Sequence, residues 1–341
     1  MKHTRTFALM LAGACAALAA PSAALAQSVA DFYRGKTVRV IVGFSSGGGY
    51  DQYARIVARH MGKHTPGAPT FIVQNMPGAA SFKSIVYLEQ GAPQDGTVIA
   101  TFNAGLISQS LTMPEKVKAD FRRFAWIGNI SEDFRVCFTW GAKNLKTFDQ
   151  VKAAKEIVFG TTGVGTSAYI EGRMLDEIFG VRLKQVQGYP GSADKRIAIE
   201  RGELDGDCGS WTSLPDDWLR DNKINLFVRF SRNTTADMPK DLLYAGSLLS
   251  DPEMKETYAL LMSGAELGRP VIGPPGMPAD RLDSLRVAFN AMVKDPEFLA
   301  DATKQRLEIN PQTGQEVAAQ LADIYKTSPG AIKRARAISG E

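Results

Sequence analysis

The sequence has few of the residues from which metal centres and hydrolytic active sites are built. Its 341 residues include three histidines and three cysteines, and one of each, His3 and Cys15, lies near the N-terminus. A structural zinc site takes four such ligands, and a serine hydrolase needs a histidine base beside its serine. The remaining histidines, His60 and His64, share one predicted helix with no third ligand nearby. We expect no bound metal and no cofactor, and we interpret the two histidines as a solvated helix end.

The sequence also lacks an excess of charge of either sign. It holds 40 Lys and Arg against 36 Asp and Glu, a net charge of +4, and two of these bases (Lys2 and Arg5) lie before residue 27. There is no basic or acidic tail, which argues against binding to nucleic acid or to an anionic membrane surface. Hydrophobic residues make up 44% and charged residues 22%, as in a folded globular protein. The length exceeds what one core usually supports, so we expect two lobes.

Long apolar runs are absent except at the N-terminus. A basic segment (residues 1–5) precedes the apolar run Phe7–Ala20 and the small-residue site Ala24-Leu25-Ala26. This three-part pattern is typical of a secretory signal peptide. We predict cleavage after Ala26 and a soluble mature protein in the periplasm.

Two cysteines, Cys137 and Cys208, remain after that cleavage. In an oxidising compartment they could form one disulfide. They could equally be two buried thiols, because the sequence does not supply the Cα separation that a disulfide requires.

Strand-like and helix-like segments alternate along the chain. Lys36–Phe44, Thr70–Gln74 and Thr97–Phe102 are predicted strands, with predicted helices between them. A second series begins near residue 129, and the chain returns to helix from about residue 247. We predict an α/β fold of two hinged lobes, each a mostly parallel sheet with helices on both faces. The expected boundaries are a signal peptide at 1–26, lobe 1 at 27–128 plus 248–341, and lobe 2 at 129–247.

Two motifs favour an enzyme when taken alone. Residues 43–47 (GFSSG) match the nucleophile elbow of secreted α/β hydrolases, with Ser45 as the nucleophile. However, His60 and His64 lie roughly 15–20 Å along the following helix and point away from its start, so the base is missing. Residues 163–168 (GVGTSA) match a short dinucleotide fingerprint, which is weak evidence in an exported chain. A secreted hydrolase stays as the alternative, but we expect no enzyme.

Three turns place glycines and hydroxyl groups before predicted helices: residues 45–50, 161–167 and 188–192. Helix N-termini carry unpaired N–H donors and a partial positive charge, so they suit carboxylates. Glycine and serine also serve simply as caps and turns. Several such turns at the carboxyl edge of two sheets nevertheless favour a ligand clamp. These turns contain no Lys or Arg, which we expect to favour release of the ligand.

These turns, in their order, resemble those of the Bug-type solute receptors of tripartite tricarboxylate transporters. The matching segments are residues 44–55 (FSSGGGYDQYAR), 74–80 (QNMPGAA), 93–97 (PQDGT), 163–167, 188–192 (GYPGS), 201–205 (RGELD) and 272–278 (IGPPGMP). The chain departs from the family pattern where Ser45 and Ser46 replace prolines and where Ala79-Ala80-Ser81 lacks the usual glycines. The stretch from 237 to 269 does not follow the pattern.

The resemblance implies a two-lobed, type II-like periplasmic binding protein that closes on a small carboxylate and delivers it to a membrane permease. It also implies a monomer with no nucleic-acid partner, although a role as ligand-input partner of a sensor is not distinguished. The ligand could be a di- or tricarboxylate or an aromatic acid. Three aromatic residues, Tyr50, Tyr189 and Trp211, hint at a larger or aromatic acid, although aromatic residues more commonly fill cores. The ligand-binding residues that the resemblance implies are Ser45, Ser46, Gly47, Gly48, Gly49, Tyr50, Asn103, Ala104, Gly105, Thr162, Gly163, Val164, Gly165, Thr166, Ser167, Tyr189, Gly191, Ser192, Cys208 and Trp211.

Overall fold

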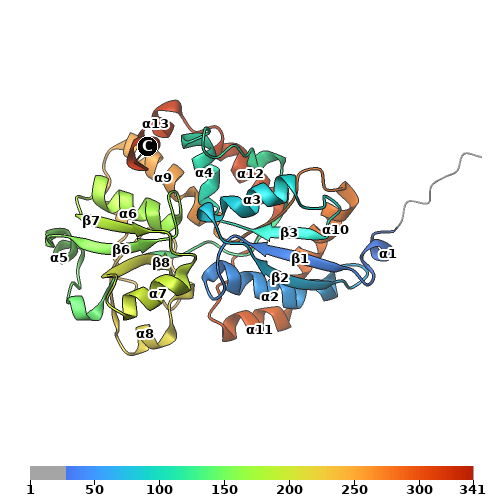
Figure 1. The fold of residues 1–341 in the computed structure, drawn as a ribbon, viewed down its shortest axis with the longest axis horizontal. Helices are drawn as coiled ribbons and strands as arrows, with labels where there is room; N and C mark the ends of the chain where they lie inside the picture. The colour runs from blue at the N-terminus through green and yellow to red at the C-terminus, as the bar shows by residue number, and fades with distance from the viewer. Residues whose placement is uncertain (1–27, 341) are drawn as a thin grey trace, which may run out of the picture.

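Two β-sheets lie side by side in the computed structural model, which describes residues 28–340 (Figure 1). The predicted signal peptide therefore lies outside the described residues. The first sheet has the strand order β11-β4-β10-β3-β1-β2, and the second has the order β7-β6-β8-β5-β9. The strands are β1 (Thr37–Val42), β2 (Thr70–Asn75), β3 (Val98–Thr101), β4 (Ala125–Asn129), β5 (Arg135–Trp140), β6 (Ile157–Thr161), β7 (Leu183–Gln187), β8 (Gly206–Ser210), β9 (Ile224–Arg229), β10 (Pro270–Gly273) and β11 (Gln312–Thr313).

Helices pack around both sheets. They are α1 (Val29–Tyr33), α2 (Gly49–His64), α3 (Phe82–Gln90), α4 (Gly105–Thr112), α5 (Phe148–Ala153), α6 (Ser167–Glu177), α7 (Ser192–Glu200), α8 (Asp216–Arg220), α9 (Pro252–Glu266), α10 (Ala279–Met292), α11 (Pro296–Lys304), α12 (Gly314–Ile324) and α13 (Pro329–Ile338). None of these helices, within residues 28–340, is long and apolar enough to cross a membrane.

Both sheets are mixed, and in each of them most strands run in the same direction, in agreement with the predicted fold class. In the first sheet β1 is parallel to β2 and β3, but β10 runs antiparallel to β3 and β4. In the second sheet β6 is parallel to β7 and β8, but β5 runs antiparallel to β8 and β9. The antiparallel strands β5 and β10 are the first that the chain forms after crossing from the other sheet. Such a crossing brings the chain in from the opposite end, and hydrophobic periodicity carries no information about strand direction.

Apolar side chains cover both faces of each sheet. On β1, Val38, Val40 and Val42 face one core cluster with α2 and α10, and Ile41 faces a second cluster with α3 and α4. This alternation follows from the two-residue period of a strand. The second sheet likewise separates a cluster around α6 from one around α7 and α8.

Two connections join the sheets: residues 130–134, between β4 and β5, and the stretch from β9 through α9 to β10. The connections pair with each other, since the Asp133 N–H donates to the Ala265 carbonyl and the Arg269 N–H to the Ser131 carbonyl. Helices α9 and α13 pack into the core of the second sheet through residues such as Leu261 and Ala335. The predicted boundaries at residues 129 and 248 stay a prediction.

Candidate functional site

A cavity of about 50 Å³ lies between the two sheets, which we call the central cavity. Its lining comes from the α2 N-terminus, the end of β3, the β4–β5 connection, the α6 and α7 N-termini and β8. The predicted site residues that line it are Gly48, Gly49, Tyr50, Asn103, Thr162, Thr166, Ser167, Ser192 and Cys208. The sequence analysis missed Phe44, Asp133, Arg135, Ala168 and Lys195, which also line it.

The other predicted residues lie around this cavity rather than on its wall. Ser45 donates its hydroxyl proton to Asp194 on α7 at 2.7 Å, while Ser46 and Gly47 are exposed. Gly191 precedes α7, and Ala104 and Gly105 begin α4, where Gly105 contacts Gly165. Gly163 faces Ala80, and Val164 packs against the core of the second sheet.

Trp211, predicted from the resemblance, does not line the central cavity. It is buried beside Phe134, and its indole N–H donates to Asp237 at 2.9 Å. An aromatic residue in a core of this kind is explained by packing.

The three helices that begin at the central cavity, α2, α6 and α7, have no side-chain cap at their N-termini. The N-cap residues of α2, α6 and α7 are Gly48, Thr166 and Gly191, and none of them accepts a hydrogen bond from its helix. Elsewhere Asp251 and Asp295 cap α9 and α11 with their carboxylates. An uncapped helix start leaves backbone N–H donors and partial positive charge available. Three of these starts, from both sides, converge on one cavity.

The first turn of α2 contains an acidic residue, Asp51, whose carboxylate is bonded to other groups. Its carboxylate accepts hydrogen bonds from the Gly47 N–H, the Arg55 guanidinium and the Asn75 amide. Burial raises the pKa of Asp51, but these hydrogen bonds outweigh it and hold the pKa below its usual value. The charge of Asp51 is therefore matched within α2 and its neighbours.

A cluster of six buried charges forms the floor of the cavity on the side of the second sheet, and we call it the floor cluster. Arg135 pairs with Glu171 at 2.7 Å and with Asp133 at 3.3 Å. Lys195 pairs with Asp207 at 2.6 Å, and Arg269 pairs with Asp133 at 2.7 Å. Arg135 and Lys195 line the cavity, so positive side chains reach it although the three turns themselves contain no Lys or Arg.

Burial and neighbouring charges compete in setting the pKa values of the floor cluster. Burial raises the pKa of Asp133, but the charges of Arg269 and Arg135 outweigh it and hold that pKa below its usual value. Burial raises the pKa of Asp207 and lowers that of Lys195. Burial, reinforced by Asp133 and Asp207, raises the pKa of Glu171 to about 7 against the opposing charge of Arg135.

Two residues of the floor cluster, Lys195 and Arg135, could have been recognised from the sequence. Lys195 shares a buried helix face with Ala198 and Ile199, so a charged residue interrupts an apolar stripe. Arg135 likewise begins a strand that is mostly apolar after it. Both patterns mark a buried charge, but only the fold brings their partners Glu171 and Asp207 close.

The two lobes make direct hydrogen bonds around the central cavity, so the structure is in a closed arrangement. Asn103 donates to the Gly165 carbonyl at 3.2 Å, and Arg196 donates to the Gly47 carbonyl at 2.9 Å. On another side of the cleft Arg306 pairs with Asp237 at 2.9 Å and with Asp216.

The enzyme motif and the candidate metal ligands have other partners. Ser45 contacts a carboxylate and not a histidine, since His60 and His64 contact Asp301 and Asp295 beside α11. The one group of metal-type ligands within residues 28–340 consists of Cys137, Glu171 and Cys208. Its two cysteines form a disulfide, which answers the question that the sequence left open. Sulfur atoms in a disulfide are not the thiolates that bind metals.

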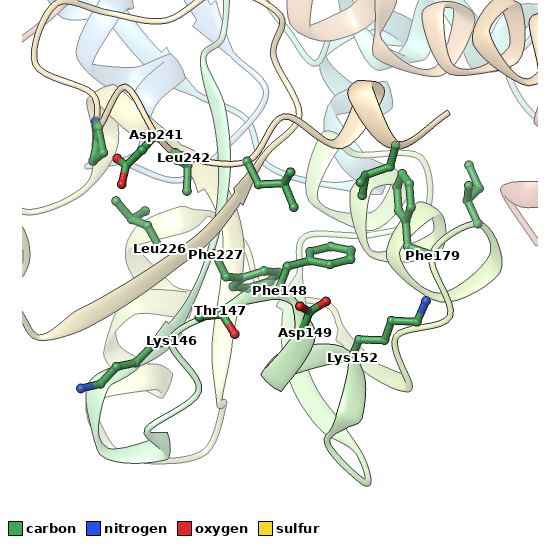
Figure 2. A pocket seen from close by; sticks show the side chains of 14 residues that line it. Lys146, Thr147, Phe148, Asp149, Lys152, Phe179, Leu226, Phe227, Asp241 and Leu242 are labelled. Carbon is green, nitrogen blue, oxygen red and sulfur yellow. The ribbon is translucent and has the colours of Figure 1, made fainter. Parts of the chain in front are cut away.

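A larger cavity, of about 890 Å³, lies on the second lobe alone (Figure 2). Phe148, Phe179 and Phe227 line it, and Lys146 points away from these rings. Its lining residues all belong to the stretch from 146 to 248. Closure of two lobes would not change this cavity, so it does not fit a clamp.

Comparisons with known proteins place this geometry in context. No protein-family model matches the chain. A UPF0065 protein in the TAR-I ttuE-ttuC' intergenic region of Agrobacterium vitis is 25% identical over 273 residues, which are 78% of this chain and 74% of that protein. A UPF0065 protein of Bordetella bronchiseptica is 23% identical over 322 residues, 92% of this chain and 89% of that protein.

Solved structures share the fold. The periplasmic binding protein BugD superposes with a TM-score of 0.71 at 20% identity, covering 90% of this chain and 98% of BugD. MatC from Rhodopseudomonas palustris, solved with bound malate, gives 0.70 at 18% identity, covering 89% and 99%. A TctC solute binding protein from Polaromonas gives 0.60 at 18% identity, covering 89% and 99%.

The fold is that of a two-lobed α/β periplasmic binding protein, as predicted. The resemblance to Bug-type solute receptors, first drawn from the turns, is confirmed by these relatives and neighbours. Two of these neighbours, BugD and the Polaromonas protein, are described as binding proteins.

Proposed function

We propose that this chain is a periplasmic receptor that captures a small organic carboxylate between its two lobes and delivers it to the permease of a tripartite tricarboxylate-type transporter. The observation that carries the proposal is the convergence of three uncapped helix N-termini, from both lobes, on the central cavity. Malate bound to the similar MatC fold supports a carboxylate ligand. A signal peptide at 1–26, a monomeric state and lobe boundaries at 129 and 248 belong to the same proposal.

Binding in this proposal involves no chemistry. Backbone N–H groups at the starts of α2, α6 and α7 donate to the carboxylate oxygens, and ordered water fills the remaining gaps. Hydroxyl groups of Thr162, Ser167 and Ser192 add donors at the same wall. Arg135 and Lys195 supply positive charge that Glu171, Asp133 and Asp207 partly offset. The ligand favours the closed arrangement only through its higher affinity for that arrangement.

The variant Gly48→Asp tests the proposal. Aspartate is a preferred N-cap residue, so its carboxylate would cap α2 and place negative charge where the ligand carboxylate belongs. A Cβ at Gly48 would lie 3.7 Å from its nearest neighbour, the Ser192 nitrogen, so the fold has room for it. We expect an unchanged or higher melting temperature and loss of carboxylate binding by at least about 10-fold, given that capping and charge repulsion each contribute on the order of 1 kcal/mol.

Calorimetric titration with small carboxylates measures this effect. Gly330→Asp is the matched control, because it puts the same residue in the first turn of α13, at an exposed position away from the cleft. Wild-type affinity in a folded Gly48→Asp variant would contradict the proposed site.

A further inference from the structure

A second cavity, of about 310 Å³, opens beside the central cavity, and we call it the mouth cavity. One wall comes from the first lobe and the other from the second, so the cavity has its present shape only when the lobes are closed. Its lining consists of Gly43, Phe44, Pro77, Gly78, Ala79, Ala80, Ser81, Thr162, Gly188, Tyr189 and Pro190.

The two cavities share part of their walls. Phe44 and Thr162 line both of them. The ring of Phe44 stacks on Tyr50, with 5.0 Å between ring centroids, and Tyr50 lines the central cavity. The two cavities therefore adjoin each other at Phe44 and Thr162.

The chemistry of the two linings differs. Asp133, Arg135 and Lys195 line the central cavity. The lining of the mouth cavity contains no carboxylate, guanidinium or ammonium group. It offers instead the half-buried rings of Phe44 and Tyr189 together with proline and alanine side chains. An uncharged, largely apolar group fits such a wall, whereas a second carboxylate would lose its hydration there without a charged partner.

The first-lobe wall of the mouth cavity is held in an unusual backbone conformation. Gly78, Ala79, Ala80 and Ser81 all have positive φ, at 141°, 46°, 52° and 81°. Left-handed conformations cost free energy in residues other than glycine, and such residues persist only where their surroundings fix them. Hydrogen bonds from the Asn103 N–H to the Ser81 hydroxyl and from the Asn103 amide to the Ala80 carbonyl, at 3.2 and 3.4 Å, tie this wall to the central cavity.

We propose that the mouth cavity is a second subsite, which holds the aryl or branched alkyl part of a monocarboxylate whose carboxylate group lies in the central cavity. This inference rests on the proposed function and narrows its ligand class. The volumes of the two cavities fit this division of the ligand. The central cavity, at about 50 Å³, holds a few water-sized groups, such as those of a carboxylate. An apolar cavity of about 150 Å³ is already large enough to hold benzene. The mouth cavity, at about 310 Å³, is larger than that.

Titration calorimetry with acetate, phenylacetate and succinate tests the subsite. Acetate is small enough to fill only the central cavity. Phenylacetate carries the same carboxylate group with an aromatic ring attached. Succinate carries a second carboxylate group in place of the ring. We expect phenylacetate to bind at least about 10-fold more tightly than acetate, and more tightly than succinate, because burial of a ring is worth more than 1.4 kcal/mol. Succinate binding more tightly than phenylacetate, or equal affinities for acetate and phenylacetate, would overturn the subsite while leaving the proposed function in place. If none of the three acids binds, the proposed function fails and the subsite fails with it.

The variant Tyr189→Ala locates the effect, because Tyr189 lines the mouth cavity and not the central one. The preference of this variant for phenylacetate over acetate should fall to about threefold or less, since one wall of the ring site is lost. Tyr189→Phe, which keeps the ring, should retain the preference. A melting curve and the acetate titration report whether each variant is folded. An unchanged preference in folded Tyr189→Ala would place the ring elsewhere and refute the assignment.

Discussion

At the level of single residues, the central cavity is lined by buried charged side chains that form ion pairs with one another. Six ionisable groups in the floor cluster form four ion pairs, with Arg135 and Asp133 each in two of them, and nearly all of their surface is buried. Burial makes each charge costly unless it is paired, so removal of one member leaves its partner uncompensated. Glu171 is the member whose charge state changes near neutral pH.

Replacement of Glu171 by glutamine should change the pH dependence of stability. The folded state raises the pKa of Glu171 to about 7 from an ordinary value of 4.5, so the folded protein binds this proton more tightly than the unfolded chain. The stabilisation from this group is complete below the unfolded pKa and is lost as pH rises through about 7. In the wild type this group lowers the free energy of unfolding by on the order of 3 kcal/mol as the pH rises from 5 to 8. In Glu171→Gln we expect this decrease to be absent.

Urea unfolding at several pH values measures this difference. Glu177→Gln is the matched control, because it makes the same substitution at an exposed position at the end of the same helix. Parallel profiles for the wild type and Glu171→Gln would contradict the assignment.

Elements of the second lobe are joined covalently as well as by packing. Cys137 on β5 and Cys208 on β8 occupy directly opposite positions of an antiparallel pair, and their disulfide closes a loop with a sequence separation of 71 residues. Most of the second sheet lies within that loop. A long loop of this kind restricts the unfolded chain strongly.

The double variant Cys137→Ala/Cys208→Ala should be less stable than the wild type. Loss of the cross-link and of its buried sulfur atoms should lower the free energy of unfolding by about 2 to 5 kcal/mol. Denaturant unfolding under oxidising conditions measures it, and wild-type protein treated with a thiol reductant should lose a similar amount once unfolded. Equal midpoints for the variant and the oxidised wild type would show that the disulfide does not stabilise the fold.

At the scale of the whole molecule, the closed arrangement depends on contacts that the two lobes make with each other. These contacts surround the cavities: Ser45 with Asp194, Asn103 and Gln109 with the Gly165 carbonyl, and Arg306 with two carboxylates. The Arg306 pairs are partly exposed, so each should contribute modestly. Because the Arg306 pairs join the two lobes, we expect their loss to change the equilibrium between open and closed arrangements more than the stability of the fold.

Arg306→Ala should shift the unliganded protein toward open arrangements. The variant loses its pairs with Asp216 and Asp237 across the cleft, and we expect a larger radius of gyration in small-angle scattering and an affinity lowered by no more than about 10-fold. Arg334→Ala is the control, because Arg334 pairs with Asp251 at the start of α9, away from the cleft. Identical scattering from Arg306→Ala and the wild type would mean that these pairs do not hold the lobes together.

Local signals in the sequence predicted the alternation of elements and the turns of the site. The glycine-rich turn at residues 45–50 and the predicted helix that carries His60 and His64 agree with α2 at Gly49–His64, since helical periodicity and turn residues are local properties of the chain. The short strands β4 and β10 were not predicted. They are short and buried, so neither has the alternation that marks an exposed strand.

Local sequence patterns were enough to predict the α/β class, the glycine and hydroxyl turns at the helix starts and the absence of a histidine near Ser45, because each depends on residues close together in the chain. Three other features emerge only in the folded chain: the direction of β5 and β10, the pairing of Cys137 with Cys208, and the meeting of Arg135, Glu171, Lys195 and Asp207 beneath one cavity. Those features join residues that are distant in sequence, and their free energies depend on burial and separation in space, which no local pattern records.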